Sequence, residues 1–222
     1  MPYPSIIAVD GPAGSGKSAV SSAVARQLNY LFVDTGAFYR AITLLALEHG
    51  IDTRSEADTT TLAQQAELDL EARAGHFAFL ANGTDITVRL NTPEVDAHVS
   101  YIARTAGVRT ALFDAQRSIA GRGKVIMAGR DIGTVVLPDA DLKLYIDASL
   151  EARATRRYRQ RLAEGRDADL NTIREGLRQR DEIDSGRAVA PLTRAEDAIY
   201  LDTSDLTLEE AIAAMLHIIE TT

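Results

Sequence analysis

Cysteine is absent from this chain of 222 residues, and histidine occurs only four times. The lack of cysteine excludes a disulfide framework, a thiolate metal site and a cysteine nucleophile. The histidines lie far apart, and their spacing is not that of metal ligands; they are His49, His76, His98 and His217. We interpret each of them as a surface or packing residue.

Long apolar runs are also missing. No run approaches the roughly 18 residues that a membrane-spanning helix needs. The first apolar run begins within a few residues of Met1, which leaves no room for the basic and apolar regions of a signal peptide. No internal repeat or low-complexity segment is visible. These features predict a soluble cytoplasmic protein that has no membrane partner.

Positive charge is in the minority, with 24 Lys and Arg against 32 Asp and Glu and a formal net charge of −8. This balance argues against affinity for nucleic acid or anionic lipid over the whole surface. Any site for an anion must therefore be built locally. The length and a hydrophobic content of 45% predict one globular core, to which lobes can be attached.

The most informative segment matches the phosphate-loop pattern G-x-x-x-x-G-K-[ST] at every fixed position: Gly11-Pro12-Ala13-Gly14-Ser15-Gly16-Lys17-Ser18. An apolar run precedes it and a helical pattern follows it. Its glycines let backbone amides surround a polyphosphate at the start of a helix. We expect Lys17 to reach the terminal phosphates and Ser18 to hold a magnesium ion. The alternative is an ordinary glycine-rich turn between a strand and a helix.

Apolar runs and helical patterns alternate along much of the chain. The runs predict strands over residues 5–10, 30–34, 124–129 and 142–146, and a last strand over residues 198–202. The helical patterns cover residues 19–28, 37–48, 95–120 and 170–180, and a last helix begins at Thr207. Thr207 and Glu210 fit a capping box. This alternation predicts an α/β fold with a parallel sheet flanked by helices.

The region from residue 51 to residue 98 has a different character. A helical piece around residues 60–67 leads to two alternating runs, 75–80 and 86–90, which Asn82-Gly83 joins. Asn-Gly between alternating runs is a strong hairpin signal. We expect an antiparallel hairpin in an inserted lobe. The alternative is a hairpin at the edge of the main sheet.

Polar residues follow two of the predicted strands. One strand end leads through Asp34-Thr35-Gly36 to Tyr39-Arg40, and another leads to Arg130-Asp131. Ligands of open α/β sheets bind beyond the carboxyl ends of the strands, and the planar fork of arginine matches phosphate oxygens. We therefore expect these arginines to face one crevice. Taken singly, each is also compatible with a surface ion pair.

Charged residues also concentrate near residue 184. If a helix continues through this stretch, Arg180, Asp184 and Arg187 fall on one face. The alternative is a solvated stripe of ion pairs.

A run between Glu151 and Arg166 is dense in arginine; its members are Arg153, Arg156, Arg157, Arg159, Arg161 and Arg166. Such a run is compatible with an RNA-binding helix, a solvated face or a lid that folds onto phosphates. Only Tyr158 supplies an aromatic ring, and the chain is acidic overall. Together with the phosphate loop, these facts favour a mobile cationic lid.

Four motifs in order resemble the bacterial cytidylate kinases. They are the phosphate loop, Asp34-Thr35-Gly36-Ala37-Phe38-Tyr39-Arg40, Gly129-Arg130-Asp131-Ile132-Gly133-Thr134-Val135-Val136, and Arg180-Asp181-x-x-Asp184-x-x-Arg187 leading into Ala190-Pro191-Leu192. The resemblance extends through Leu192 and includes the hairpin insertion. One departure is Thr35, where the family more often has serine; the hydroxyl is retained.

This resemblance implies a P-loop NTPase-type parallel sheet flanked by helices, with an inserted antiparallel β-hairpin lobe and a helical lid. The implied core comprises residues 1–38, 99–150 and 169–222. The implied monophosphate-binding lobe comprises residues 39–98, and the implied arginine-rich lid comprises residues 151–168.

The resemblance also implies a reaction, the transfer of a phosphoryl group from ATP-Mg²⁺ to CMP or dCMP. ATP would be bound by the loop from Gly11 to Ser18 and by Arg156 and Arg157. The nucleotide acceptor would be bound by Thr35, Tyr39, Arg40, Ser100, Arg109, Arg130, Asp131, Arg180, Asp184 and Arg187. Ser100, Arg109 and Asp131 would read the cytosine edge. The catalytic cations would be Lys17, Arg130, Arg157 and Arg187. A monomer without a nucleic-acid partner is expected.

Other nucleoside monophosphate kinases, such as a UMP/CMP kinase, are the nearest alternatives, followed by small-metabolite kinases with the same core. A regulatory GTPase would need the motifs N-K-x-D and D-x-x-G, and the sequence contains neither. A P-loop ATPase that binds nucleic acid is a further alternative, which polynucleotide-stimulated ATP hydrolysis would reveal.

Overall fold

The computed structural model describes residues 3–73 and 76–222, and its contacts divide the chain into two compact units. One unit comprises the chain up to Asp34 together with Gly123–Thr222, and the other comprises Thr35–Arg122. The first unit contains a five-stranded sheet and the second a three-stranded sheet. The division of the chain into core, lobe and lid by function stays a prediction.

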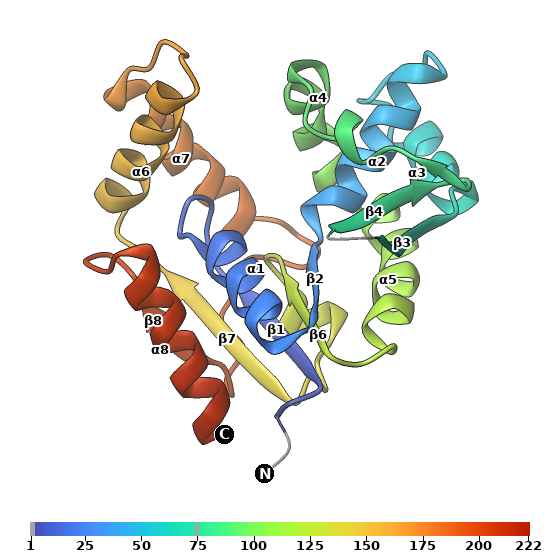
Figure 1. The fold of residues 1–222 in the computed structure, drawn as a ribbon. Coiled ribbons are helices and arrows are strands. Elements are labelled where there is room, and N and C mark those ends of the chain that lie inside the picture. The colour runs from blue at the N-terminus through green and yellow to red at the C-terminus, as the bar shows by residue number, and fades with distance from the viewer. Residues whose placement is uncertain (1–2, 74–75) are drawn as a thin grey trace. The chain divides into compact units, whose positions relative to one another are not determined.

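The five-stranded sheet has the order β2 (Leu31–Asp34), β6 (Val125–Ala128), β1 (Ile6–Asp10), β7 (Leu142–Asp147) and β8 (Ile199–Asp202) (Figure 1). Neighbouring strands pair in parallel, which confirms the predicted α/β sheet. Asp34 and Val9 both lie opposite Ala128. The carboxyl ends of β2, β6 and β1 therefore meet at one edge of the sheet.

Helices α1 (Lys17–Leu28) and α8 (Leu208–Thr221) cover one face of this sheet, because their apolar side chains share one buried cluster with Ile7 and Val9 of β1. Successive strand residues point to opposite faces, so Ala8 faces the other way. The capping box at Thr207 is confirmed, since Glu210 donates its N–H to the threonine Oγ1 at 3.2 Å and accepts the Thr207 N–H at 2.8 Å.

Two further helices of this unit, α6 (Leu150–Ala163) and α7 (Leu170–Ser185), pack against each other. Helix α7 continues past the predicted end at Arg180 to Ser185. A π-helical turn, Ile132–Val136, follows β6. Helix α6 contains most of the arginine-rich run.

The second unit contains α2 (Gly36–Glu48), α3 (Glu56–Gln65), α4 (Pro93–Arg104) and α5 (Ala106–Ala120) around the antiparallel strands β3 (Leu68–Arg73), β4 (His76–Ala81) and β5 (Thr84–Asp85). Phe38 of α2 is fully buried, and its ring meets that of Phe79 edge-on at 5.0 Å. Because these strands form a sheet of their own, the expectation of an inserted lobe is confirmed and that of an edge hairpin is wrong.

The predicted hairpin is correct at its turn and wrong in its second strand. Asn82 and Gly83 both have positive φ, 50° and 74°, as a tight hairpin turn requires. The predicted strand 86–90 is instead a 3₁₀ turn at Thr87–Arg89, because Asp85 accepts hydrogen bonds from the Thr87 N–H and hydroxyl and curls the chain. Strand β4 pairs mainly with β3, which the sequence analysis did not predict; Gly75 of the first run lies outside the described residues.

The single helix predicted over residues 95–120 is two helices. Thr105 adopts an extended conformation (φ −71°, ψ 116°) and separates α4 from α5. Close packing accounts for the change of direction, since a Cβ added at Gly107 would lie 2.3 Å from Thr60 Oγ1 on α3. The glycine lets α5 start directly against α3.

Candidate active site

The phosphate loop connects β1 to α1 in the form that its glycines require. Gly11, Gly14 and Gly16 have positive φ values of 149°, 80° and 89°. A Cβ added at Gly11 would lie 2.0 Å from Ile146 O, so no other residue fits there without moving β7. Turns of this kind point successive N–H groups into a concave surface that binds anions.

Lys17 is the first residue of α1 and is buried. Its Nζ donates to Pro12 O at 3.0 Å, so the side chain folds back over its own loop. Burial lowers the pKa of Lys17 well below its ordinary value, and the positive charges of Arg130 and Arg180 lower it further. Asp34 and Asp10 oppose this effect. A polyphosphate bound here would offset the mutual repulsion of these cations.

Ser18 and Asp34 lie together beside the loop. The Ser18 hydroxyl donates to Asp34 Oδ2 at 2.7 Å, and Asp34 is the last residue of β2. The parallel register explains this contact, because it brings the carboxyl ends of the strands to one edge. The sequence analysis placed Asp34 at a strand end but gave it no role.

Asp10 is a second carboxylate that the sequence analysis missed. It is the last residue of β1 and is 4% exposed, and it accepts the N–H groups of Ile132 and Gly133, both at 2.8 Å. Burial, the largest effect, raises its pKa to about 6 although these hydrogen bonds lower it. Asp10 thus ties the start of the phosphate loop to the segment that follows Arg130 and Asp131.

Arg130 and Arg187 are joined by Asp184. Arg130 Nε donates to Asp184 Oδ2 at 2.8 Å, and Arg187 Nη2 donates to Asp184 Oδ1 at 2.9 Å. Burial would raise the pKa of Asp184, but the two guanidinium groups outweigh it and hold the pKa below its usual range. Arg187 lies beyond the end of α7 and reaches Asp184 by folding back. The structure therefore brings together three predicted site residues, and the charge of Arg180 also acts on Asp184.

Within the second unit, the structure brings Tyr39 and Arg109 together. Arg109 is 2% exposed, its Nη1 donates to Ala103 O at 3.1 Å, and its guanidinium lies 5.2 Å from the centre of the Tyr39 ring. This contact is a cation–π interaction. Arg109 is therefore part of the packing of this unit, and its predicted reading of cytosine stays a prediction.

Three further predicted residues belong to the second unit. Arg40 donates to Leu90 O at 3.1 Å and pairs with Asp96 at 2.6 Å. Thr35 is buried at the start of α2, and Ser100 is exposed on α4. Their binding of CMP stays a prediction.

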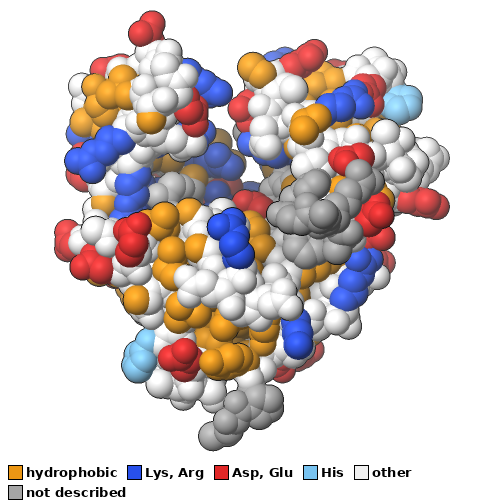
Figure 2. Space-filling model, in the orientation of Figure 1, with side chains coloured by type: hydrophobic (Ala, Val, Ile, Leu, Met, Phe, Trp, Pro, Cys, Tyr) orange, Lys and Arg blue, Asp and Glu red, His pale blue; other side chains and the backbone are white. Residues whose placement is uncertain are grey.

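The arginines of α6 differ in their surroundings. Arg156 donates to Ser15 O at 3.3 Å, to Leu206 O at 3.3 Å and to both oxygens of Thr203. Arg157 is exposed and donates to Gln160 at 2.8 Å. Figure 2 shows Lys and Arg side chains over the α6 and α7 part of the surface, with Asp and Glu side chains among them. Arg156 thus braces the phosphate loop, while Arg157 faces solvent.

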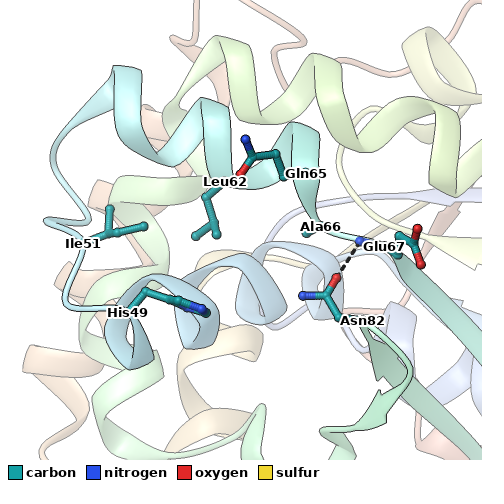
Figure 3. Close-up of a pocket in the computed structure, with 7 residues that line it drawn as sticks. All are labelled: His49, Ile51, Leu62, Gln65, Ala66, Glu67 and Asn82. Carbon is teal, nitrogen blue, oxygen red and sulfur yellow. Dashed lines mark hydrogen bonds between the residues drawn. The ribbon is translucent and has the colours of Figure 1, made fainter.

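A cavity of about 530 Å³ lies in the second unit (Figure 3). It is lined by His49, Ile51, Leu62, Gln65, Ala66, Glu67 and Asn82, and Asn82 accepts the Glu67 N–H at 2.9 Å across it. No predicted site residue lines this cavity, so we assign it no part in the reaction.

Two further observations concern the described residues, 3–73 and 76–222. None of their helices is long and apolar enough to cross a membrane. They also contain no group of three or more His, Asp or Glu side chains arranged to hold a metal ion.

Comparisons with known proteins agree with this geometry. The family model "Cytidylate kinase" matches residues 7–221. A cytidylate kinase from Exiguobacterium sibiricum is 45% identical over 215 residues, covering 96% of both chains, and one from Desulfitobacterium hafniense is 46% identical, covering 96% of this chain and 91% of its own. A solved structure of an uncharacterized protein from Eubacterium ventriosum shares the fold, with a TM-score of 0.52 and 13% identity, covering 98% of this chain and 99% of its own. The chain belongs to the cytidylate kinase family.

Proposed function

We propose that this chain transfers the terminal phosphoryl group of ATP to CMP and dCMP through the residues around Lys17. The observation that carries the proposal is the burial of Lys17 inside a glycine-rich loop, beside the charges of Arg130 and Arg180. Cations held this close suit a ligand with several negative charges, and a phosphate donor and acceptor supply them. The family match supports cytidine nucleotides as acceptors.

The donor, ATP, is proposed to bind the amides of the phosphate loop. Gly11, Gly14 and Gly16 give the loop the shape that surrounds phosphates with backbone amides. Lys17 would contact the terminal phosphates of ATP. Arg157 is exposed on α6 and would exchange one contact with Gln160 for a phosphate oxygen. Arg156 would have to give up its carbonyl contacts to bind ATP directly.

Magnesium fits the oxygen atoms at the start of α1. The hydroxyl of Ser18 and the carboxylate of Asp34 lie within hydrogen-bond distance of each other. Mg²⁺ prefers oxygen ligands and is usually bound by one or two protein groups together with phosphates and water. We propose Ser18 and Asp34 as its protein ligands. A magnesium ion bound there would neutralise charge on the phosphates of ATP.

The acceptor phosphate is proposed to bind Arg130 and Arg187, which Asp184 holds in place. The second pKa of a phosphate monoester is about 6, so the attacking oxygen is already ionised near neutral pH. It forms a bond to the γ-phosphorus while the bond to the bridging oxygen of ADP breaks. No general base is needed, and the protein contributes alignment and charge neutralisation.

Base recognition is proposed to involve Asp131. Its carboxylate can accept a hydrogen bond from the exocyclic amino group of cytosine, which uracil lacks. Asp131 is 4% exposed, and a site built to hydrogen-bond a substrate N–H discriminates against an analogue that lacks this group. Thr35, Tyr39, Arg40, Ser100 and Arg109 are further proposed ligands of CMP.

A coupled ADP-release assay tests this proposal. The purified chain would be given ATP-Mg²⁺ with CMP, dCMP, UMP, AMP, dTMP or shikimate in turn. We expect fast ADP release with CMP and dCMP and slower release with the others. No acceleration by either cytidine nucleotide would contradict the proposal, and stimulation by a polynucleotide instead would indicate a nucleic-acid-dependent ATPase.

A further inference from the structure

Arg153 is the arginine of α6 that lies deepest in the protein. It is 6% exposed, and its guanidinium donates in three directions. Nε donates to Ala148 O at 2.9 Å, and Nη1 donates to Ala13 O of the phosphate loop at 3.1 Å. Nη1 and Nη2 meet the two carboxylate oxygens of Asp181 at 3.1 and 2.7 Å. A two-pronged pair of this kind fixes direction as well as distance.

The side chain of Arg153 also packs against the loop itself. Gly14 has φ +80°, and a Cβ added there would lie 3.3 Å from the Arg153 Cβ. Arg153 therefore touches the loop twice, through the carbonyl of Ala13 and through the surface of Gly14. These are the residues whose backbone must keep its shape for the amides to face a phosphate.

Asp181 connects this contact to α7. It follows Arg180 directly and precedes Asp184 by three residues, which places it on an adjoining side of the same helix. Asp184 meets Arg130 and Arg187, while Asp181 meets Arg153. One helix thus contacts both the phosphate loop, through Arg153, and the arginine cluster that is the proposed acceptor site.

We propose that Arg153 and Asp181 are positioning residues that hold the Ala13–Gly14 backbone in its ATP-binding shape. Neither residue has a role in the mechanism described above, and neither is proposed to touch a nucleotide. Asp181 orients the guanidinium, and the guanidinium fixes the carbonyl of Ala13. The inference rests on the proposed binding of ATP by the loop.

A second ion pair between α6 and α7 provides a matched control. Arg174 and Glu151 join the same two helices at 3.3 Å, but their side chains are 42% and 65% exposed. An exposed pair of this kind contributes little. The variant Glu151→Gln therefore removes a salt bridge between α6 and α7 without disturbing the loop.

The experiment compares Arg153→Lys, Asp181→Asn, the double variant and Glu151→Gln. Calorimetry gives the Kd for ATP-Mg²⁺, and steady-state kinetics give the KM for ATP and for CMP. Lysine keeps the charge but lacks the fork that reaches Ala13 and Asp181 together. Because hydrogen bonds to charged groups are worth more than neutral ones, we expect each single variant to weaken ATP binding about tenfold.

The KM for CMP should change by less than about twofold in these variants, since the proposed acceptor contacts remain. The double variant should bind ATP about as tightly as the single variant with the lower affinity, because both changes break the same chain of contacts. Glu151→Gln should match the wild type. If Arg153→Lys does not fold, Asp181→Asn, whose side chain is already 26% exposed, tests the same contact.

Lower thermal stability with an unchanged Kd for ATP would overturn the inference, since it would show a purely structural pair. Additive losses in the double variant, or equal losses for ATP and CMP, would also overturn it. Failure of the proposed function looks different, because the wild type would then bind ATP without releasing ADP in the presence of CMP. Calorimetry reports on ATP binding in either case.

Discussion

Replacing Asp10 by asparagine removes its buried charge together with one of its two acceptor oxygens, and the pH dependence of stability separates the effect of the charge from that of the lost acceptor. The carboxylate lies at the junction of β1 and the phosphate loop, where burial raises its pKa from 3.8 to about 6. The charge of Asp131 also raises this pKa, and the charge of Lys17 lowers it. Burial is the main cause of the raised pKa of Tyr145 on β7, and the charge of Asp10 also contributes to it. The ionised carboxylate is therefore less stable in the folded chain than in the unfolded one.

The size of the effect follows from the shift. A difference of about two pKa units corresponds to about 3 kcal/mol. Between pH 3.8 and about pH 6 the folded chain keeps the proton that the unfolded chain has lost. The free energy of unfolding of the wild type therefore falls as pH rises through this window, by about 3 kcal/mol from this group. In Asp10→Asn the site does not titrate, so the free energy of unfolding of the variant, relative to that of the wild type, should rise by about 3 kcal/mol as the pH rises through this window.

Urea unfolding followed by far-UV circular dichroism from pH 4 to pH 7.5 measures this difference, because the chain has no tryptophan for fluorescence. The variant Asp139→Asn, which changes an exposed loop aspartate, controls for the loss of one charge. When the free energy of unfolding is plotted against pH, we expect the difference between Asp10→Asn and the wild type to change with pH. The difference between Asp139→Asn and the wild type should stay constant. A constant difference between Asp10→Asn and wild type across this range would refute the reasoning.

Three other predictions concern the loop and the proposed base contact. Gly11→Ala should lower the free energy of unfolding by at least about 3 kcal/mol, because the added Cβ would collide with Ile146 O. Gly176→Ala on α7 is the control, since Gly176 has open space around it, and it should leave the stability unchanged or raise it by up to about 1 kcal/mol. Thermal melts of the two variants and the wild type measure the difference. Lys17→Met should lower kcat about a hundredfold or more in the ADP-release assay. An unchanged kcat would contradict the proposed contact of Lys17 with the phosphates of ATP. Asp131→Ala should narrow the preference for CMP over UMP, and an equal kcat/KM ratio in variant and wild type would remove Asp131 from base recognition.

The phosphate loop and the capping box were predictable because their signals are local. Positive φ at Gly11, Gly14 and Gly16 needs no distant partner, and the Thr207–Glu210 contact spans one helical turn. The central strands β1, β6 and β7 were predictable for a related reason, since a run buried on both faces must be almost wholly apolar. The family motifs also pointed to Arg130, Asp184 and Arg187, and the structure places these three together.

Partners far apart in sequence could not be predicted in this way. Asp10 meets Ile132 and Gly133, and Arg153 meets Ala13, across more than 100 residues. The second strand of the hairpin failed for a different reason: the hydrogen bonds from Thr87 to Asp85 are local, but an alternating pattern alone does not show that they form a turn there. The break at Thr105 depends on α3, against which Gly107 packs.

The amino-acid sequence by itself determined which segments form the sheet, where phosphates are expected to bind and which arginines are candidates for the reaction. Those features depend on periodicity, backbone freedom and charge within a few residues. Only the tertiary structure decided which carboxylate holds which guanidinium, that Arg153 braces the loop while Arg157 faces solvent, and that Asp10 is buried. Desolvation and hydrogen-bond geometry fix those outcomes, and both arise only when distant strands and helices pack together.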